Sequence, residues 1–331
     1  MESTDTLLLN RSDVAGLLTI QECMAAVEHA FALHAEGKAA PPKVLGVHSR
    51  DGGIHIKAGI LELQRPYLVT KINANFPGNP KEYDLPTIQG VVVVCDGING
   101  RLLSLMDSIE ITIIRTGAAT AIAAKYLARA DARVATICGC GNQGRISLKA
   151  LMKVRRIEKV YAFDTNNRQI EKFRQEFLQQ VEIIPVSATD LQQALRNSQI
   201  CITCTTSNKP FISTDDILPG TFIAAVGADS EEKQELFPEL VASSKIVVDI
   251  AQQCATIGEL NHAIKKGLIT VDNIHAELGQ IIAGLKPGRE SDEEIIIFDS
   301  TGTALQDVAA AAIAYEKALS AGIGTKMNFS E

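Results

Sequence analysis

Between residues 134 and 298, short apolar runs alternate with segments of helical pattern. In chain order the runs read VATICG, KVYAF, VEIIPV, ICITC, TFIAAVG, KIVVDI and EIIIF. Continuous apolar strands connected by helices are typical of a parallel sheet, because crossover helices cover both of its faces. The alternation therefore predicts an α/β chain with a doubly wound, Rossmann-type domain.

The first 115 or so residues have a different pattern. Residues 20–36 repeat apolar positions at spacings of three and four, which predicts a helix. The segments GGIHIKAGIL, PYLVTKINANF and GVVVVCDGINGRLLSLMD read as strands of a mixed or antiparallel sheet. The Ala-rich ALQDVAAAAIAYEKAL predicts a last helix that packs back on this part. We expect a smaller α+β domain of residues 1–115 and 305–331, and a nucleotide-binding domain of residues 116–304.

The net charge limits the kinds of partner that the protein is expected to bind. The formal net charge is −7 and the pI is near 5.5, whereas nucleic acids and anionic membranes favour a clustered positive surface, which the sequence lacks. The N-terminus, MESTDTLLLN, has no basic segment followed by a long apolar one, and no window reaches the roughly 18 apolar residues of a membrane-spanning helix. We expect a cytoplasmic protein that binds neither nucleic acid nor membrane.

The seven cysteines do not form the pattern of a disulfide framework, because their number is odd and they are spread over a long chain. Cys201 and Cys204, in CITC, have the spacing of a redox or zinc half-site. However, the run is apolar, and no second pair or nearby histidine accompanies it. We interpret these cysteines as small buried strand residues and predict no metal.

The stretch VATICGCGNQGRISLKAL carries the spacing G-x-G-x-x-G at Gly139, Gly141 and Gly144. These glycines directly follow a strand-like run and open a helical pattern, so the spacing predicts a dinucleotide-binding turn with phosphates at a helix N-terminus. Asp164 ends the next strand, where its carboxylate can accept both ribose hydroxyls. This favours NAD over NADP, although the nearby Arg168 keeps NADP open.

Basic residues interrupt apolar strands of the first domain at Lys43, His55, Lys57, Lys71 and Arg115. Strand alternation would turn some of them toward a common cleft. For the first four taken singly, a solvated strand face is the simpler interpretation. Arg115 differs, because it follows the apolar run IEITII and precedes a helix start of small residues. We expect it to be buried, where a guanidinium needs a carboxylate or phosphate partner.

Polar residues follow two later strands of the predicted parallel sheet. Asp229 stands just past TFIAAVG, and ligands bind at the carboxyl ends of strands in such sheets; the alternative is that Asp229 caps a helix. Asp299, Ser300 and Thr301 end the last strand. We assign the Ser300 hydroxyl to the cofactor and that of Thr301 to the substrate, or both to the capping of the last helix.

Taken together, the segments PPKV, KINANFPGNP, LPT, IRTGAAT, GCGNQG, AVGADSEEKQEL and GRESDEEIIIFDSTGTALQD resemble the ornithine cyclodeaminase and mu-crystallin family. The resemblance runs over residues 8–317. Within that family, the sequence is most similar to the archaeal-type alanine dehydrogenases. It implies a homodimer built through the first domain, and a substrate cleft between the domains.

The resemblance also implies residue roles. Lys43, Lys71 and Arg115 match the group that holds the substrate carboxylate, and Asp229 matches the catalytic carboxylate. Lys43 stands where cyclodeaminases commonly carry arginine, and this removes a bidentate carboxylate fork. Lys57, with His55, could serve a second carboxylate. The matching cofactor positions are Thr87, Thr116, Asn142, Gln143, Asp164, Thr205, Lys233 and Ser300. Arg115, next to Thr116, is a cofactor position as well. Val226, Gly227 and Ala228 are expected to line the nicotinamide.

The leading hypothesis is therefore an NAD-dependent enzyme that transfers hydride between the cofactor and the α-carbon of a small 2-amino or 2-imino acid. Alanine dehydrogenation to pyruvate and ammonia is the best match. In this reading Lys71 or Asp229 moves the protons. The alternatives are ornithine cyclodeamination, reduction of a cyclic imino acid or of an imino dicarboxylate, and a non-catalytic ligand-binding protein of the mu-crystallin type.

Overall fold

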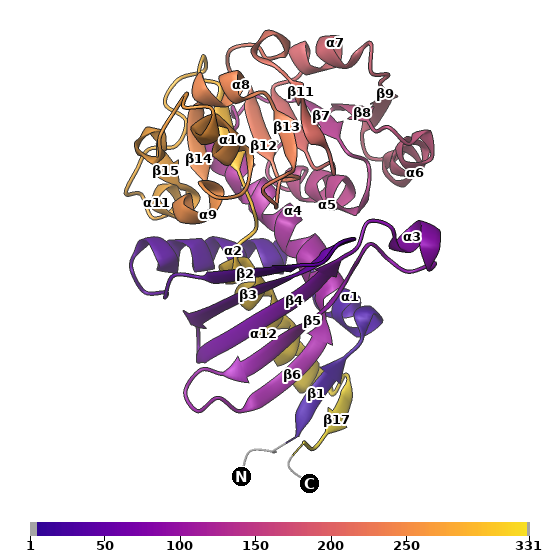
Figure 1. Ribbon diagram of the computed structural model, residues 1–331, viewed down its shortest axis with the longest axis vertical. Helices are drawn as coiled ribbons and strands as arrows, with labels where there is room; N and C mark the ends of the chain where they lie inside the picture. The colour runs from indigo at the N-terminus through magenta and orange to yellow at the C-terminus, as the bar shows by residue number, and fades with distance from the viewer. Residues whose placement is uncertain (1–4, 330–331) are drawn as a thin grey trace. The chain divides into compact units, whose positions relative to one another are not determined.

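The computed structural model describes residues 5–329, which divide into two compact units (Figure 1). The first unit contains the chain up to Arg115 and again from Thr303 onward, and the second unit contains Thr116–Gly302. Helix α4 (Ser108–Leu127) begins in the first unit and ends in the second. Each unit has its own sheet.

The first unit is built on a seven-stranded mixed sheet with the order β17-β1-β6-β5-β4-β3-β2. Strands β2 to β6 form an antiparallel meander, while β1 runs parallel to β6 and antiparallel to β17. The bounds are β1 (Thr6–Leu9), β2 (Lys43–His48), β3 (Gly53–Glu62), β4 (Pro66–Asn75), β5 (Ile88–Asp96), β6 (Leu102–Asp107) and β17 (Thr325–Met327).

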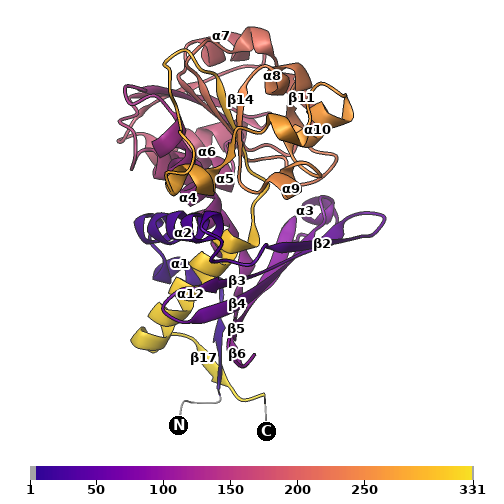
Figure 2. The ribbon, with the colours of Figure 1, turned by 90° about the vertical axis from the view of Figure 1, so that its left-hand side faces the viewer.

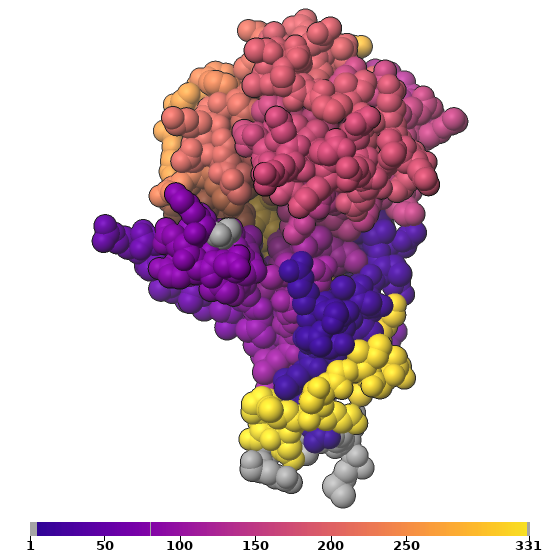
Figure 3. Space-filling view, turned by 90° about the vertical axis from the view of Figure 1, so that its right-hand side faces the viewer, coloured from indigo at the N-terminus to yellow at the C-terminus, as the bar shows by residue number. Residues whose placement is uncertain are grey.

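Two long helices lie on one face of this sheet, as Figure 2 shows. Helix α2 (Ile20–Ala35) begins at a capping box in which Thr19 and Glu22 satisfy each other's backbone N–H groups. Helix α12 (Ala304–Ala321) packs on α2 and on β3, β4 and β5, so the Ala-rich helix does return to the first part of the chain. In Figure 3 the yellow part of the chain lies beside the indigo part, in agreement with the pairing of β17 with β1. The shorter helices of this unit are α1 (Arg11–Leu17) and α3 (Asn79–Glu82).

The opposite face of the sheet is apolar and exposed. Alternation along the strands places Leu45, Val47, Ile54 and Leu68 there, and Leu45 and Val47 are 57% and 55% exposed. The same alternation turns Lys57 and Lys71 toward α12. A wide exposed apolar face on a sheet is typical of a protein contact.

The second unit contains an eight-stranded parallel sheet with the order β15-β14-β16-β12-β10-β7-β8-β9. Each of the seven predicted runs overlaps one of its strands, which confirms the doubly wound α/β fold. The strands are β7 (Val134–Cys138), β8 (Lys159–Phe163), β9 (Glu182–Pro185), β10 (Ile200–Thr203), β12 (Phe222–Ala225), β14 (Lys245–Val248), β15 (Ala276–Glu277) and β16 (Ile296–Asp299).

The chain order places a topological switch point between β7 and β10, where ligands bind in folds of this kind. Helices connect the strands, and the bounds are α5 (Asn142–Leu151), α6 (Asn167–Phe177), α7 (Leu191–Arg196), α8 (Pro238–Ala242), α9 (Ala251–Cys254), α10 (Glu259–Lys265) and α11 (Leu278–Ile282), with the 3₁₀ turns η1 (Thr214–Asp216) and η2 (Val271–Asn273).

Two features differ from the expectation. The run IEITII before Arg115 is helical, not a strand, because Asp107 accepts hydrogen bonds from the backbone N–H groups of Ile109 and Glu110 and so starts α4. The other is a separate two-stranded parallel pair, β11 (Asn208–Ile212) with β13 (Gln234–Leu236), which the pattern did not indicate. Over residues 5–329, no helix is both long and apolar enough to span a bilayer.

Candidate functional site

A buried salt bridge joins β4 to α12 in the first unit. The Lys71 ammonium donates to Asp307 Oδ1 over 2.7 Å and to Thr112 Oγ1 over 3.3 Å. Lys71 is 2% and Asp307 1% exposed. The two residues are 236 positions apart in the chain, so only the tertiary fold brings them together.

Arg115, on α4, joins the same cluster. Its Nη1 donates to Gln306 Oε1 over 2.7 Å, and its Nε lies 3.2 Å from Asp307 Oδ1. The expectation that Arg115 is buried holds, since the residue is 7% exposed. Asp307 supplies the carboxylate partner that a buried guanidinium needs. The other end of the Gln306 amide, Nε2, is buried without a hydrogen-bond partner among the described residues.

Lys57, on β3, lies directly opposite Lys71 in the antiparallel register and is also buried. Burial, together with the charges of Arg115 and Lys57, lowers the pKa of Lys71 to about 7, although the charge of Asp307 opposes the shift. The pKa of Asp307 is lowered: burial would raise it, but the Lys71, Arg115 and Lys57 charges outweigh burial. We call Lys57, Lys71, Arg115, Gln306 and Asp307 the cationic cluster.

The cationic cluster holds three basic side chains around one carboxylate. Among these four groups, when all are ionised, positive charge exceeds negative charge in a region of low dielectric, and a bound anion would lower the cost in free energy. A planar carboxylate fits this demand, because both guanidinium and ammonium groups donate charge-assisted hydrogen bonds to it. A lysine with a pKa near neutrality can in addition exchange a proton with a bound molecule.

Lys43 and His55 lie outside the cationic cluster. Lys43 begins β2 and is exposed. It pairs with Ala58, so strand alternation places its side chain on the opposite face of the sheet from that of Lys57. The ring of His55 packs edge-on against that of His48, with 5.6 Å between centroids. Thr87 precedes β5, and its backbone oxygen accepts from Phe76 N.

In the second unit, the glycine turn joins β7 to α5. Gly139 has φ of +102°, which a side chain would strain, and a Cβ on Gly144 would lie 2.0 Å from Gly139 O. A Cβ on Gly141 would meet only open space, so the chain can be approached there. No side chain caps the N-terminus of α5, and its N–H groups are suited to an anion. Asn142 and Gln143 form its first turn, and Gln143 Oε1 is buried with no partner among the described residues.

Asp164 follows β8 and faces the glycine turn. Its Oδ2 accepts from Cys140 N, inside the G-C-G sequence, and its Oδ1 accepts from Asn166 N, each over 2.8 Å. These two backbone donors fix the carboxylate while leaving lone pairs for further donors. Asn166 caps α6 by accepting from Arg168 N, so Arg168 lies in the first turn of that helix, four residues after Asp164.

Asp229 lies in the loop after β12. Its carboxylate accepts from Lys233 Nζ over 2.5 Å, and the side chain is 47% exposed. The next helix, α8, begins at Pro238, so Asp229 does not cap a helix. Before it, Val226 N donates to Thr203 O and Gly227 N donates to Glu235 Oε2, which ties this loop to β10 and β13.

Ser300 and Thr301 are held by one buried carboxylate. Ser300 Oγ donates to Asp249 Oδ2 over 3.1 Å, and Thr301 Oγ1 donates to Asp249 Oδ1 over 3.3 Å. Thr301 also accepts from Gln253 Nε2 over 2.7 Å. Thr301 thus belongs to the second unit, whereas the other predicted substrate residues belong to the first.

The remaining predicted cofactor residues also lie in the second unit. Thr205 donates its backbone N–H to Glu235 Oε1 over 2.7 Å and accepts from Ser207 N at its hydroxyl. Thr116 is buried in α4, and its backbone oxygen accepts from Thr120 Oγ1. Gln306 and Asp307 were not among the site residues predicted from the sequence. They are a polar pair in the otherwise apolar stretch 304–312 of an Ala-rich helix, and this contrast could have indicated a buried partner.

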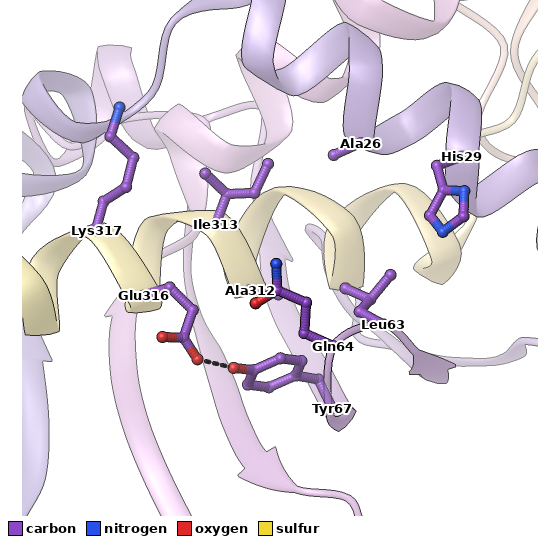
Figure 4. A pocket seen from close by; sticks show the side chains of 9 residues that line it. All are labelled: Ala26, His29, Leu63, Gln64, Tyr67, Ala312, Ile313, Glu316 and Lys317. Carbon is purple, nitrogen blue, oxygen red and sulfur yellow. Dashed lines mark hydrogen bonds between the residues drawn. The ribbon is translucent and has the colours of Figure 1, made fainter.

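A separate cavity in the first unit contains none of the predicted site residues. It has a volume of about 520 Å³ and lies between α2, α12 and the turn from β3 to β4, with Tyr67 donating a hydrogen bond to Glu316 at one end (Figure 4). Its lining is mostly apolar. The basic groups expected to hold a carboxylate are not part of it.

Comparisons with known proteins agree with the motifs. The family model described as ornithine cyclodeaminase/mu-crystallin family matches residues 4–322. An alanine dehydrogenase from Archaeoglobus fulgidus is 42% identical over 327 residues, covering 98% of this chain and 99% of that protein.

Two solved structures have the same fold. An archaeal alanine dehydrogenase dimer with bound NAD is 40% identical, with a TM-score of 0.93 and coverage of 98% of this chain and 99% of that one. The Δ(1)-pyrroline-2-carboxylate reductase of Thermococcus litoralis, in complex with NADH and L-proline, is 37% identical, with a TM-score of 0.90 and coverage of 97% and 100%. The chain therefore belongs to the ornithine cyclodeaminase/mu-crystallin family.

Proposed function

We propose that the protein is an NAD-dependent oxidoreductase that transfers hydride between NAD(H) and the α-carbon of a small 2-amino or 2-imino acid. The observation that carries this proposal is the cationic cluster, in which Lys71 and Arg115 contact the carboxylate of Asp307 and Lys57 lies directly opposite Lys71. Such a cluster favours a substrate with a carboxylate. Relatives that share the fold over nearly the whole chain are dehydrogenases and imine reductases of this substrate class.

The cofactor requirement fits the second unit. Gly141 leaves room for a pyrophosphate at the uncapped N-terminus of α5, and Asp164 presents oriented acceptors for ribose hydroxyls. When bound, NAD accepts or returns the hydride. Both solved relatives contain NAD or NADH. The carboxylate of Asp164 would repel a 2′-phosphate, so NAD is favoured over NADP.

The chain's own residues would bind and protonate the substrate. Arg115 and Lys57 hold the carboxylate, which fixes the α-carbon for hydride transfer. Lys71, with its pKa lowered to about 7, exchanges the proton of the amine or carbinolamine. Asp229, partly exposed in the loop after β12, serves as a second proton carrier or binds the amine.

Alanine is the substrate we favour: alanine, NAD and water give pyruvate, ammonium and NADH, with release of a proton. The 42% identity to an alanine dehydrogenase over nearly the full chain supports this choice. Reduction of a cyclic imino acid is the second candidate, because the solved reductase binds L-proline. Lys43 is exposed and lacks the fork of an arginine, which weakens the case for ornithine cyclodeamination.

The protein would act as a homodimer joined through the exposed sheet face of the first unit. Leu45, Val47, Ile54 and Leu68 would otherwise keep a broad apolar surface in water. The solved alanine dehydrogenase relative is a dimer.

A substrate panel tests the proposal. The protein is incubated with NADH, ammonium and one 2-oxo acid or cyclic imine at a time, and loss of NADH absorbance is followed. Consumption of NADH with pyruvate supports alanine chemistry, and selective consumption with pyrroline-2-carboxylate supports the second candidate. In a separate arm the protein is incubated with ornithine and NAD, and if proline forms without net formation of NADH, the enzyme is a cyclodeaminase. If tight binding of substrates occurs with no turnover in any arm, the protein is a binding protein.

A further inference from the structure

Glu235, on β13 of the second unit, is fully buried and makes hydrogen bonds to two different loops. Its Oε1 accepts from Thr205 N over 2.7 Å, in the segment after β10. Its Oε2 accepts from Thr203 Oγ1 over 2.6 Å, at the end of β10, and from Gly227 N over 3.1 Å, in the segment after β12. One carboxyl group thus links the carboxyl ends of two neighbouring strands.

The close approach of the Glu235 carboxyl group to the loop after β12 depends on glycine at position 227. A Cβ there would lie 2.3 Å from Glu235 Oε2 and 2.6 Å from Thr205 O, so no side chain is tolerated without a shift of the loops. The backbone of Glu235 is in turn held by Glu259, on α10, which accepts from the backbone N–H of Glu235 over 2.7 Å and from that of Leu236 over 3.0 Å. The arrangement is therefore a connected, buried network, in which a changed member affects its neighbours.

The loop after β12 contains Val226, Gly227 and Ala228, which are expected to line the nicotinamide, and the loop after β10 contains Thr205, a predicted cofactor position. The adenosine half of the cofactor is expected elsewhere, at Asp164 and the glycine turn. We propose that Glu235 is a positioning residue that holds the loops after β10 and β12 at the separation the nicotinamide ring requires. This inference rests on the proposed function.

The chemistry of the carboxyl group makes it hard to replace. Two of its three donors are backbone N–H groups, which cannot accept a hydrogen bond. Glutamine has only one oxygen, so in either orientation its amide nitrogen would face one of these N–H groups. Burial raises the pKa of Glu235, while the hydrogen bonds from Thr203, Thr205 and Gly227 oppose that shift.

The test compares two ligands that differ in the nicotinamide alone. Calorimetric titration of the full-length protein with NADH and with ADP-ribose gives both affinities for the wild type, for Glu235→Gln and for Glu182→Gln. Glu182, on the edge strand β9, is exposed and supplies a control for the same change of charge. We expect Glu235→Gln to bind NADH about tenfold more weakly or worse, to bind ADP-ribose as the wild type does, and to lose about 10²-fold in kcat. Glu182→Gln should match the wild type throughout.

Equal losses of NADH and ADP-ribose affinity in Glu235→Gln would mean that Glu235 supports the whole unit, and would overturn the proposal. Unchanged NADH affinity would overturn it as well. If Glu235→Gln does not fold, Thr203→Val removes one of the three donors without changing shape, and the same selective loss for NADH is expected on a smaller scale. Failure of the wild type itself to bind NADH would refute the proposed function and this inference together, which distinguishes that result from the others.

Discussion

Lys57 and Lys71 occupy directly opposed positions on neighbouring antiparallel strands, and both are buried against α12. Like charges at opposed positions destabilise a sheet, and burial increases the cost. Asp307 offsets only part of this repulsion, because Arg115 shares the same carboxylate. This repulsion lowers the stability of the first unit, and under the proposed function a substrate carboxylate would relieve it.

The lowered pKa of Lys71 predicts a pH-dependent stability. In the unfolded chain a lysine keeps a pKa near 10.5, whereas in the folded protein that of Lys71 is about 7. Between these values the unfolded state binds more protons, so this group increases the free energy of unfolding as the pH rises from about 7 to about 10.5. Lys71→Met should lose that increase. Urea unfolding at several pH values checks it, and an unchanged slope in the variant would refute the assignment.

Asp164 predicts a preference for NAD. Its carboxylate is fixed by the backbone of Cys140 and Asn166, and it would meet a 2′-phosphate with like charge. The wild type should bind NADH more tightly than NADPH, and Asp164→Ser should narrow the ratio by about tenfold or more. Fluorescence titration with both cofactors measures it. Tighter binding of NADPH by the wild type would mean that Arg168 and its neighbours outweigh Asp164.

The apolar sheet face predicts a dimer. At micromolar concentration, light scattering should give twice the mass of one chain. Leu68→Glu places a charge on the exposed face and should shift the protein toward monomer. Leu319→Glu, at an exposed apolar position of α12, serves as the matched control and should leave the dimer intact. A wild type that is purely monomeric would contradict the prediction.

Replacement of Asp229 distinguishes the hypothesis of an enzyme from that of a binding protein. Asp229→Asn keeps the shape and removes the proton-accepting charge, so turnover should fall by about 10² or more. Stability should change little, because an exposed ion pair such as that with Lys233 contributes about 1 kcal/mol at most. Glu231→Gln, at a nearby exposed position, is the control and should retain activity. Near-normal turnover of Asp229→Asn would remove Asp229 from the mechanism and leave the proton transfer to Lys71.

Local sequence patterns predicted the second unit well, because a parallel strand buried on both faces appears as an unbroken apolar run such as VATICG. They failed before Arg115, where β-branched residues resemble a strand but Asp107 starts a helix. The partners of Arg115 could not be predicted from such patterns. Gln306 is 191 positions away, and only the tertiary packing of α12 brings it and Asp307 to the guanidinium. The contacts of Glu235 have the same origin: its loops meet only once the sheet is assembled.

Arg115→Ala tests the central claim most directly, which is that the cationic cluster holds the substrate carboxylate. Substrate affinity and NADH affinity are measured on the wild type and the variant, using the substrate found in the panel. We expect substrate binding to weaken by roughly 2 to 4 kcal/mol, which is about 30-fold to 10³-fold, while the dissociation constant of NADH stays nearly unchanged. Unaltered substrate affinity in a folded Arg115→Ala variant, or a loss confined to NADH binding, would contradict the account.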